Sequence, residues 1–293
     1  MSVLLQFFVN GLAAGAVYAL IALGFALIFT ATRIFHFAHG GVYAFSSFVG
    51  YTALVSLGLD LVTSFALAAL SAAAIGIAIN RTLYEPMRDL GVSSFVMMIC
   101  SFGLLIILTH LTAVIWGSNP VVLSHGGLTS VFNFGPIYIT AAQLQILGVA
   151  TALAILLVIF FRHMRLGIAI RALGNDAELA QVMGMPARRL RDVAIGVGSA
   201  LAGVSGLLVG FNVGIIDANM GFDTILMATI AMIIGGLGNV GAAAAGGLLL
   251  GIIQNLSVWQ FSSKWQMSVS FVVLILILIF RPEGIFGEKR RSV

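Results

Sequence analysis

The sequence predicts an all-α polytopic membrane protein with about eight or nine transmembrane helices, some of them broken or re-entrant at glycine-rich segments. Hydrophobic residues make up 60% of the 293 residues and charged residues only 8%, whereas soluble domains carry about 25% charged residues. The apolar runs reach about 17 to 25 residues or more, the length with which an α-helix crosses about 30 Å of hydrocarbon. They lack the polar–apolar alternation of membrane barrel strands. We therefore expect a helical bundle.

Nine apolar segments are expected to cross the membrane as a single transmembrane domain over residues 1–293. The chain begins MSVLLQFF, without a basic n-region or a nearby cleavage site, so we expect the first segment to be retained. Glycine-rich GGLGNVG (235–241) interrupts the later part, so the pair 222–259 could instead contain a re-entrant segment. The expected spans are 4–30, 40–57, 61–80, 92–115, 136–161, 193–215, 222–237, 240–259 and 266–280.

The basic residues predict which ends of these spans are cytoplasmic. If the connecting loops alternate sides, all but one of the 14 Lys and Arg fall on one side, and the other side holds only Lys264. Lys and Arg accumulate in cytoplasmic loops. We therefore expect an external N-terminus and a cytoplasmic C-terminus. The net charge of +4 follows the span ends and forms no separate basic domain, so nucleic acid is not an expected partner.

The sequence contains no evident source of energy for transport. The expected spans hold no Asp or Glu other than Asp223, at the outer rim of 222–237, whereas ion-coupled carriers commonly place such groups within their spans. A phosphate-binding loop needs G-x-x-x-x-G-K-[ST], and neither Lys264 nor Lys289 has that context. We therefore expect no catalytic residues, no cofactor and no metal, and any ATP would be bound by partner subunits. One interpretation is that another subunit supplies the energy for transport. The alternative is a stand-alone channel or an ion-coupled secondary transporter of a small polar solute, in which backbone carbonyls could bind sodium.

The most charged stretch, RALGNDAELAQVMGMPARRLRD (171–192), predicts a short bounded helix. Asn175 is the expected N-cap, with Glu178 completing a capping box and Asp176 adding favourable charge at the helix start. Gly184 is the expected residue after the helix, since glycine tolerates the left-handed conformation there. Pro186 then blocks continuation.

Leu179 and Met183, four residues apart, share one apolar face of this helix. A helix of about eight residues is not stable alone, so this face must be buried against something. It could lie on the bilayer or on its own bundle. It could equally be a docking helix for a cytoplasmic motor subunit, which the missing energy source favours.

Six stretches carry a resemblance over nearly the whole length. They are YALIALGFALIF (18–29), FAHGGVYAF (37–45), RTLYEPMR (81–88), RALGNDAELAQVMGM (171–185), GGLGNVGAAAAGGLLLG (235–251) and RPEGIFG (281–287). The chain resembles a permease subunit of the branched-chain amino acid ABC importer family, of the LivH type. This resemblance implies import of branched-chain or related amino acids across the bacterial cytoplasmic (inner) membrane, in contact with membrane lipid.

The resemblance also implies partners. They are a second, LivM-like permease subunit, two cytoplasmic ATPase subunits and an external or periplasmic solute-binding protein. The segment at about 162–192 then corresponds to the coupling loop. Its candidate ATPase contacts are Arg171, Asn175, Asp176, Glu178, Leu179, Met183, Gly184, Arg188 and Arg189.

The coupling loop lacks a literal EAA motif of the kind seen in other importer classes, so the resemblance does not specify the exact contact residues. Two further features are departures. His36 stands where the family usually has Asn, and Glu85 stands where Arg often precedes the proline. We expect Glu85 to pair with Arg81 or Arg88.

The stretch RIFHFAHGG (33–41) predicts a helix break. His36 and His39, three apart, have the spacing of a metal pair on a helix face, but no third ligand is apparent. They more readily form hydrogen bonds at a break beside Gly40. A gate or pathway role is the other interpretation, because interrupted helices hold substrates in many transporters. Asn212 and Asn239 are further pathway candidates.

The long loop 116–135 and nearby charged residues lie on the expected outer side. Asp60, Asp217, Asp223 and Lys264 are therefore candidates for docking the solute-binding protein. A simple connecting loop is an equally good interpretation.

Overall fold

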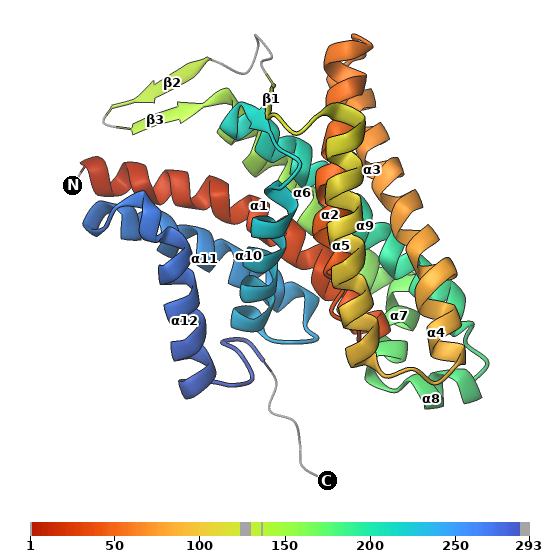
Figure 1. Ribbon diagram of the computed structural model, residues 1–293. Helices are drawn as coiled ribbons and strands as arrows, with labels where there is room; N and C mark the ends of the chain where they lie inside the picture. Colours follow the sequence, from red (N-terminus) through yellow and green to blue (C-terminus); the bar gives the residue numbers. More distant parts are fainter. Residues whose placement is uncertain (1, 124–129, 136, 288–293) are drawn as a thin grey trace.

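Helices make up most of the computed structural model, which describes residues 2–123, 130–135 and 137–287 (Figure 1). This confirms the predicted all-α fold class. The α-helices are α1 (Ser2–Thr32), α2 (Ala38–Tyr51), α3 (Leu61–Ile79), α4 (Glu85–Asp89), α5 (Ser94–Trp116), α6 (Ala141–His163), α7 (Arg165–Asn175), α8 (Ala177–Val182), α9 (Ala187–Val213), α10 (Met220–Gly235), α11 (Val240–Gln260) and α12 (Gln266–Phe280). The π-helical turns η1 (Thr52–Ser56) and η2 (Asn80–Tyr84) extend α2 and α3, and the 3-10 turn η3 (Ser263–Trp265) precedes α12.

Within the described residues, seven helical stretches are long and apolar enough to cross a membrane. They correspond to seven of the nine expected spans. Helix α6 starts at Ala141, later than expected, because a strand occupies the preceding residues. Helix α9 starts earlier, at Ala187, because the basic run extends the helix toward its N-terminus. The other two expected spans, 40–57 and 222–237, correspond to α2 with η1 and to α10, which has only 16 residues.

Two small antiparallel sheets lie at one end of the bundle, and α4, α7 and α8 lie at the opposite end (Figure 1). Strand β1 (Val121–Val122) pairs with β4 (Ile215–Ile216), and β2 (Val131–Phe134) pairs with β3 (Ile137–Thr140). The β1–β4 pair ties the loop after α5 to the end of α9. Residues 124–129 of the long expected loop lie outside the described residues.

Helices α1 and α9 form the centre of the bundle. Helix α1 packs against α11, α9, α10 and α6, and α9 also packs against α3 and α2. Glycines allow these backbones to touch: a Cβ on Gly251 would lie 2.2 Å from the backbone nitrogen of Gly15. A Cβ on Gly198 would lie 2.6 Å from the carbonyl oxygen of Gly24. Such small-residue contacts are the usual means of close helix association in lipid.

Candidate functional site

The predicted short helix exists as α8, with six residues and a different N-cap. Helix α7 continues through Asn175, and the extended backbone at Asp176 (φ −148°) separates the two helices. The Asp176 side chain accepts a hydrogen bond from the Leu179 amide at 2.9 Å. The sequence prediction of Asn175 as the N-cap is therefore wrong by one residue. Glu178 is then the second helical residue, so the expected capping box is not formed.

The end of α8 agrees with the prediction. Gly184 has φ +79°, and the Met185 amide donates to the carbonyl of Ala180 at 3.0 Å. This is the bond of a Schellman motif, in which a left-handed residue ends the helix. Pro186 immediately precedes α9.

The apolar face of α8 is not covered by this chain. Leu179, Val182 and Met183 are 58%, 84% and 72% exposed, whereas Ala180 on the other face is buried. A cavity of about 760 Å³ lies beside α8, where it faces α4 and the start of α9. Residues that line it include the candidates Gly184, Arg188 and Arg189. The short helix therefore presents three large apolar side chains outward next to a concave, charged surface.

Ion pairs hold the start of α9 against η2 and α4. The Arg191 guanidinium makes two hydrogen bonds to the Glu85 carboxylate, at 2.5 and 2.9 Å, and both side chains are buried. Arg188 contacts Glu85 at 3.6 Å and Asp89 at 2.6 Å. Arg81 instead pairs with Asp192 at 2.8 Å.

The expected pairing of Glu85 with Arg81 or Arg88 is therefore wrong. The stretch α3–η2–α4 lies alongside α9, so the nearest bases for Glu85 come from another helix and not from its own. The only sequence sign of this arrangement was the run ARRLRD (187–192), which supplies both the arginines and Asp192.

The break between α1 and α2 lies inside the bundle. Helix α1 ends at Thr32, and Arg33 adopts φ +58°. His36 is buried, and its Nδ1 lies 2.7 Å from the Tyr84 hydroxyl. The Ala38 amide donates to Ser101 Oγ at 2.9 Å, and Ser101 is the eighth residue of α5.

His39 and Gly40 complete the buried break. The His39 ring lies 6.0 Å from the Phe25 ring and 6.0 Å from the His36 ring. The predicted histidine pair is thus brought together at one place, with Tyr84 as a partner that the sequence did not indicate.

Helix α10 also begins inside the bundle, away from the sheet end. A Cβ on Gly221 would lie 2.1 Å from the carbonyl oxygen of Gly40, so the first turns of α10 and α2 touch. The Phe222 ring lies 6.2 Å from the ring of Phe102, which is the ninth residue of α5 and about 12 Å from that helix's start. Ile216 still belongs to the sheet at the end of the molecule. The chain therefore enters the bundle before α10 starts.

This path separates the charged residues that the sequence grouped together. Asp223 is exposed in the first turn of α10, at the depth of the α2 start. Asp60 is the exposed N-cap of α3, and hydrogen bonds from the Thr63 hydroxyl and backbone amide hold its pKa below the ordinary value. Asp217 accepts a bond from the Asn219 amide at 2.6 Å. Lys264 is exposed in η3.

The two asparagine candidates lie near opposite ends of the bundle. Asn212 is exposed near the end of α9, close to β4. Asn239 is the N-cap of α11, and its side chain accepts a bond from the Ala242 amide at 3.1 Å. Neither residue lies with the histidine pair.

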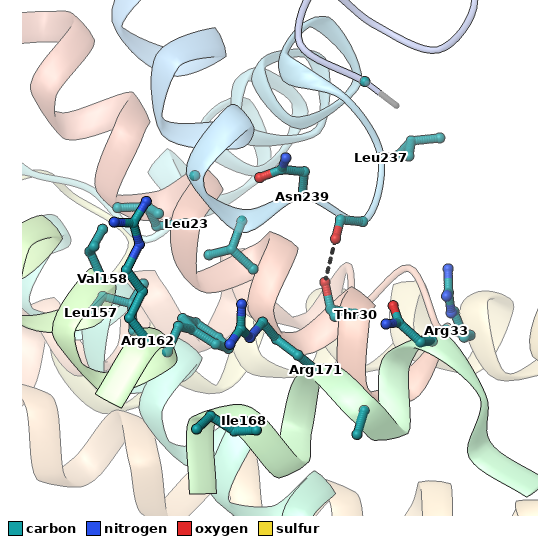
Figure 2. A pocket seen from close by; sticks show the side chains of 17 residues that line it. Leu23, Thr30, Arg33, Leu157, Val158, Arg162, Ile168, Arg171, Leu237 and Asn239 are labelled. Carbon is teal, nitrogen blue, oxygen red and sulfur yellow. Dashed lines mark hydrogen bonds between the residues drawn. The ribbon is translucent and has the colours of Figure 1, made fainter. Parts of the chain in front are cut away.

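A second cavity, of about 770 Å³, lies between the ends of α1, α6 and α7 and the loop that joins α10 to α11 (Figure 2). Arg33, Arg162 and Arg171 line it, as do Asn175 and Asn239. The sequence placed Arg171 and Asn175 with the α8 contacts. The structure places them on this separate surface.

Comparison with known proteins gives a consistent result. Residues 7–278 match the model of a family described as branched-chain amino acid transport system / permease component. The chain is 34% identical to the high-affinity branched-chain amino acid transport system permease protein LivH of Escherichia coli (strain K12), over 97% of this chain and 96% of that protein. It is 32% identical to the corresponding permease protein BraD of Pseudomonas aeruginosa, with the same coverage.

A solved structure gives a likeness in fold alone. PsaBC from Streptococcus pneumoniae in complex with Fab matches with a TM-score of 0.51 and 15% sequence identity. The match covers 95% of this chain and 93% of that one.

Proposed function

Because this chain belongs to the family of branched-chain amino acid transport system permease components, we propose that it is a membrane-spanning permease subunit of an ATP-binding-cassette importer for branched-chain or related amino acids. It forms half of the translocation pathway. The observation that carries the proposal is the identity of 34% to a permease of that activity over 97% of the chain. The seven apolar helices support it, since they provide a membrane domain.

Two cytoplasmic ATPase subunits are the proposed partners at the α8 end. The support is the exposed apolar face of Leu179, Val182 and Met183, beside a cavity with charged walls. An isolated six-residue helix is unstable in water, so its ordered ends and uncovered face fit an element that a partner completes. In this proposal the α8 end and the C-terminus are cytoplasmic, and the N-terminus is external.

The opposite end is the proposed docking surface for an external solute-binding protein. Asp60 is exposed immediately before the span Leu61–Asp89, and Lys264 is exposed at the first turn of the span Ser263–Phe280. A second, LivM-like permease is the proposed partner within the membrane. A relative named LivM, from Methanocaldococcus jannaschii, is 25% identical over 47% of this chain.

The proposed pathway passes the starts of α2 and α10. Both helices begin within the bundle, and half-helices of this kind hold substrates in other transporters through their free backbone ends. Asp223 is exposed at this depth, where a carboxylate facing lipid would be costly. We therefore place Asp223 on a polar surface, where it can attract the ammonium group of an amino acid. In this proposal His36 and His39, both buried, shape the break between α1 and α2.

Reconstitution tests the proposal. The chain is placed in proteoliposomes alone, or with its co-expressed partner permease, ATPases and solute-binding protein, and uptake of radiolabelled leucine is measured. We expect ATP-dependent uptake only for the full assembly. Uptake by the chain alone, driven by a sodium or proton gradient, would establish the alternative of a stand-alone carrier.

A further inference from the structure

The cavity lined by Arg33, Arg162 and Arg171 carries uncompensated positive charge (Figure 2). Among the described residues that line it, none is acidic. Arg33 donates to the carbonyl of Gly174, but Arg162 and Arg171 have no hydrogen-bond or ion-pair partner in the described part of the chain. By contrast, the arginines near α4 are neutralised, because each of them forms an ion pair with a carboxylate; they are Arg81, Arg188 and Arg191. The cavity is therefore suited to an anion.

Part of the wall of the same cavity is apolar, and it lies beside Arg162 (Figure 2). Leu157, Val158 and Phe161 come from the last turns of α6, and Leu23 comes from α1. Val158 also belongs to the exposed apolar face of α6, together with Ile155. Because α6 is a membrane-crossing helix, this wall is continuous with a surface that faces hydrocarbon.

The order of residues along α6 matches the layers of a membrane. Arg162 is the last residue but one of this helix, and Leu157 and Val158 lie about one turn deeper. Arg171 is supplied by α7, whose neighbouring Leu166 and Ile168 are exposed apolar residues. Helices with basic and apolar residues arranged in this way lie at the membrane interface. Charge and apolar surface therefore meet at head-group depth.

We propose that this cavity binds an anionic phospholipid, with its phosphate between Arg162 and Arg171 and an acyl chain along Leu157 and Val158. Guanidinium groups bind phosphate oxygens through paired hydrogen bonds, and basic pockets between membrane helices bind anionic head groups. Assignment to the cytoplasmic leaflet rests on the proposed sidedness. The lipid site itself does not depend on transport.

Native mass spectrometry of the purified assembly, titrated with phosphatidylglycerol, tests the site. The double variant Arg162→Ala/Arg171→Ala should bind this lipid about 30-fold more weakly, since each arginine near an anionic lipid contributes about 1 kcal/mol and 1.4 kcal/mol is tenfold. The matched control is Arg165→Ala, an exposed arginine of α7 that does not line the cavity. It should bind as the wild type does.

Two further arms identify the ligand. Val158→Trp fills the apolar wall without changing charge, so it should also weaken phosphatidylglycerol binding. Phosphatidylcholine should bind poorly, and millimolar inorganic phosphate should not displace phosphatidylglycerol. Full displacement by phosphate, with no effect of Val158→Trp, would show a site for the free anion and overturn the lipid proposal.

The remaining outcomes are equally informative. If Arg165→Ala and the double variant lost phosphatidylglycerol binding equally, the binding would depend on general surface charge and the proposed site would be wrong. If the double variant loses the second permease or the ATPases and keeps its phosphatidylglycerol, the arginines serve a protein contact and the proposal fails. Leucine uptake is not needed for any arm, so failure of the proposed transport function leaves this test intact.

Discussion

Glu85 and Arg191, 106 positions apart in the sequence, form a buried ion pair with two hydrogen bonds of 2.5 and 2.9 Å. The pair joins α4 to the start of α9, beside the helix that we propose as the ATPase contact. Removing one partner of a buried pair leaves the other charge without compensation. This contact is therefore a sensitive point for the stability of the whole α8 end.

Glu85→Ala should destabilise the protein by about 3 to 5 kcal/mol, because the Arg191 guanidinium would stay buried and unpaired. The measurement is thermal unfolding of the purified protein, monitored with a thermal-shift assay that does not depend on thiol labelling. The control is Glu178→Ala, an exposed carboxylate of α8, which should change stability by no more than about 0.5 kcal/mol. The double variant Glu85→Met/Arg191→Met should recover most of the loss; no recovery would mean that the pair itself is not the cause.

Leu179→Asp and Met183→Asp should abolish co-purification of the ATPases. Both side chains are largely exposed in this chain, so its own stability should be unchanged, whereas burying a carboxylate in an apolar contact costs several kcal/mol. Leu237→Asp, at an exposed apolar residue of the α10–α11 loop, is the control and should keep the ATPases bound. Full ATPase binding by the α8 variants would leave α8 as a surface helix only.

Gly184→Val should weaken ATPase association, because a β-branched residue is strained at φ +79°. Nothing lies within 4 Å of a Cβ built at this position, so the effect would come from the backbone and not from a clash. Gly184→Asn is the matched variant, since asparagine tolerates the left-handed region. Pull-down of the ATPases should rank wild type, then Asn, then Val, and equal loss in both variants would point to a steric contact with the partner.

Asp223→Asn should lower leucine uptake by about tenfold or more, since a hydrogen bond to a charged group is worth about 1.5 to 3 kcal/mol. The loss should appear with the solute-binding protein still bound. Asp60→Asn should instead weaken capture of the solute-binding protein, which surface plasmon resonance measures. If Asp223→Asn impairs this capture instead, Asp223 belongs to the external docking surface that the sequence suggested.

Cysteine labelling in intact cells tests the sidedness. In a Cys100→Ala background, a cysteine at Ser56, which is exposed after α2, should react with an impermeant maleimide from outside. A cysteine at Gln181, exposed on α8, should react only after the membrane is opened. The opposite pattern would reverse the assigned orientation and move the phospholipid site to the outer leaflet.

The sequence by itself determined that the protein lies in a membrane, that it is helical, and where most of its spans lie. The reason is that the length and hydropathy of each apolar run are local properties, and they decide directly whether that run can cross a membrane. It also determined the helix-ending glycine at Gly184. It misplaced the N-cap by one residue, because Asn175 and Asp176 are both good caps and only the continuation of α7 decides between them.

Only the tertiary structure decided which groups meet. Three features join segments that are far apart in the chain: the Glu85–Arg191 ion pair, the contact of Gly40 with Gly221, and the cavity lined by arginines. The physical reason is that hydropathy records whether a helix is in lipid, but not its depth, its rotation or its neighbour. Those depend on packing between helices, and packing places the first turn of α10 beside the start of α2 and brings Arg162 and Arg171 to one shared cavity.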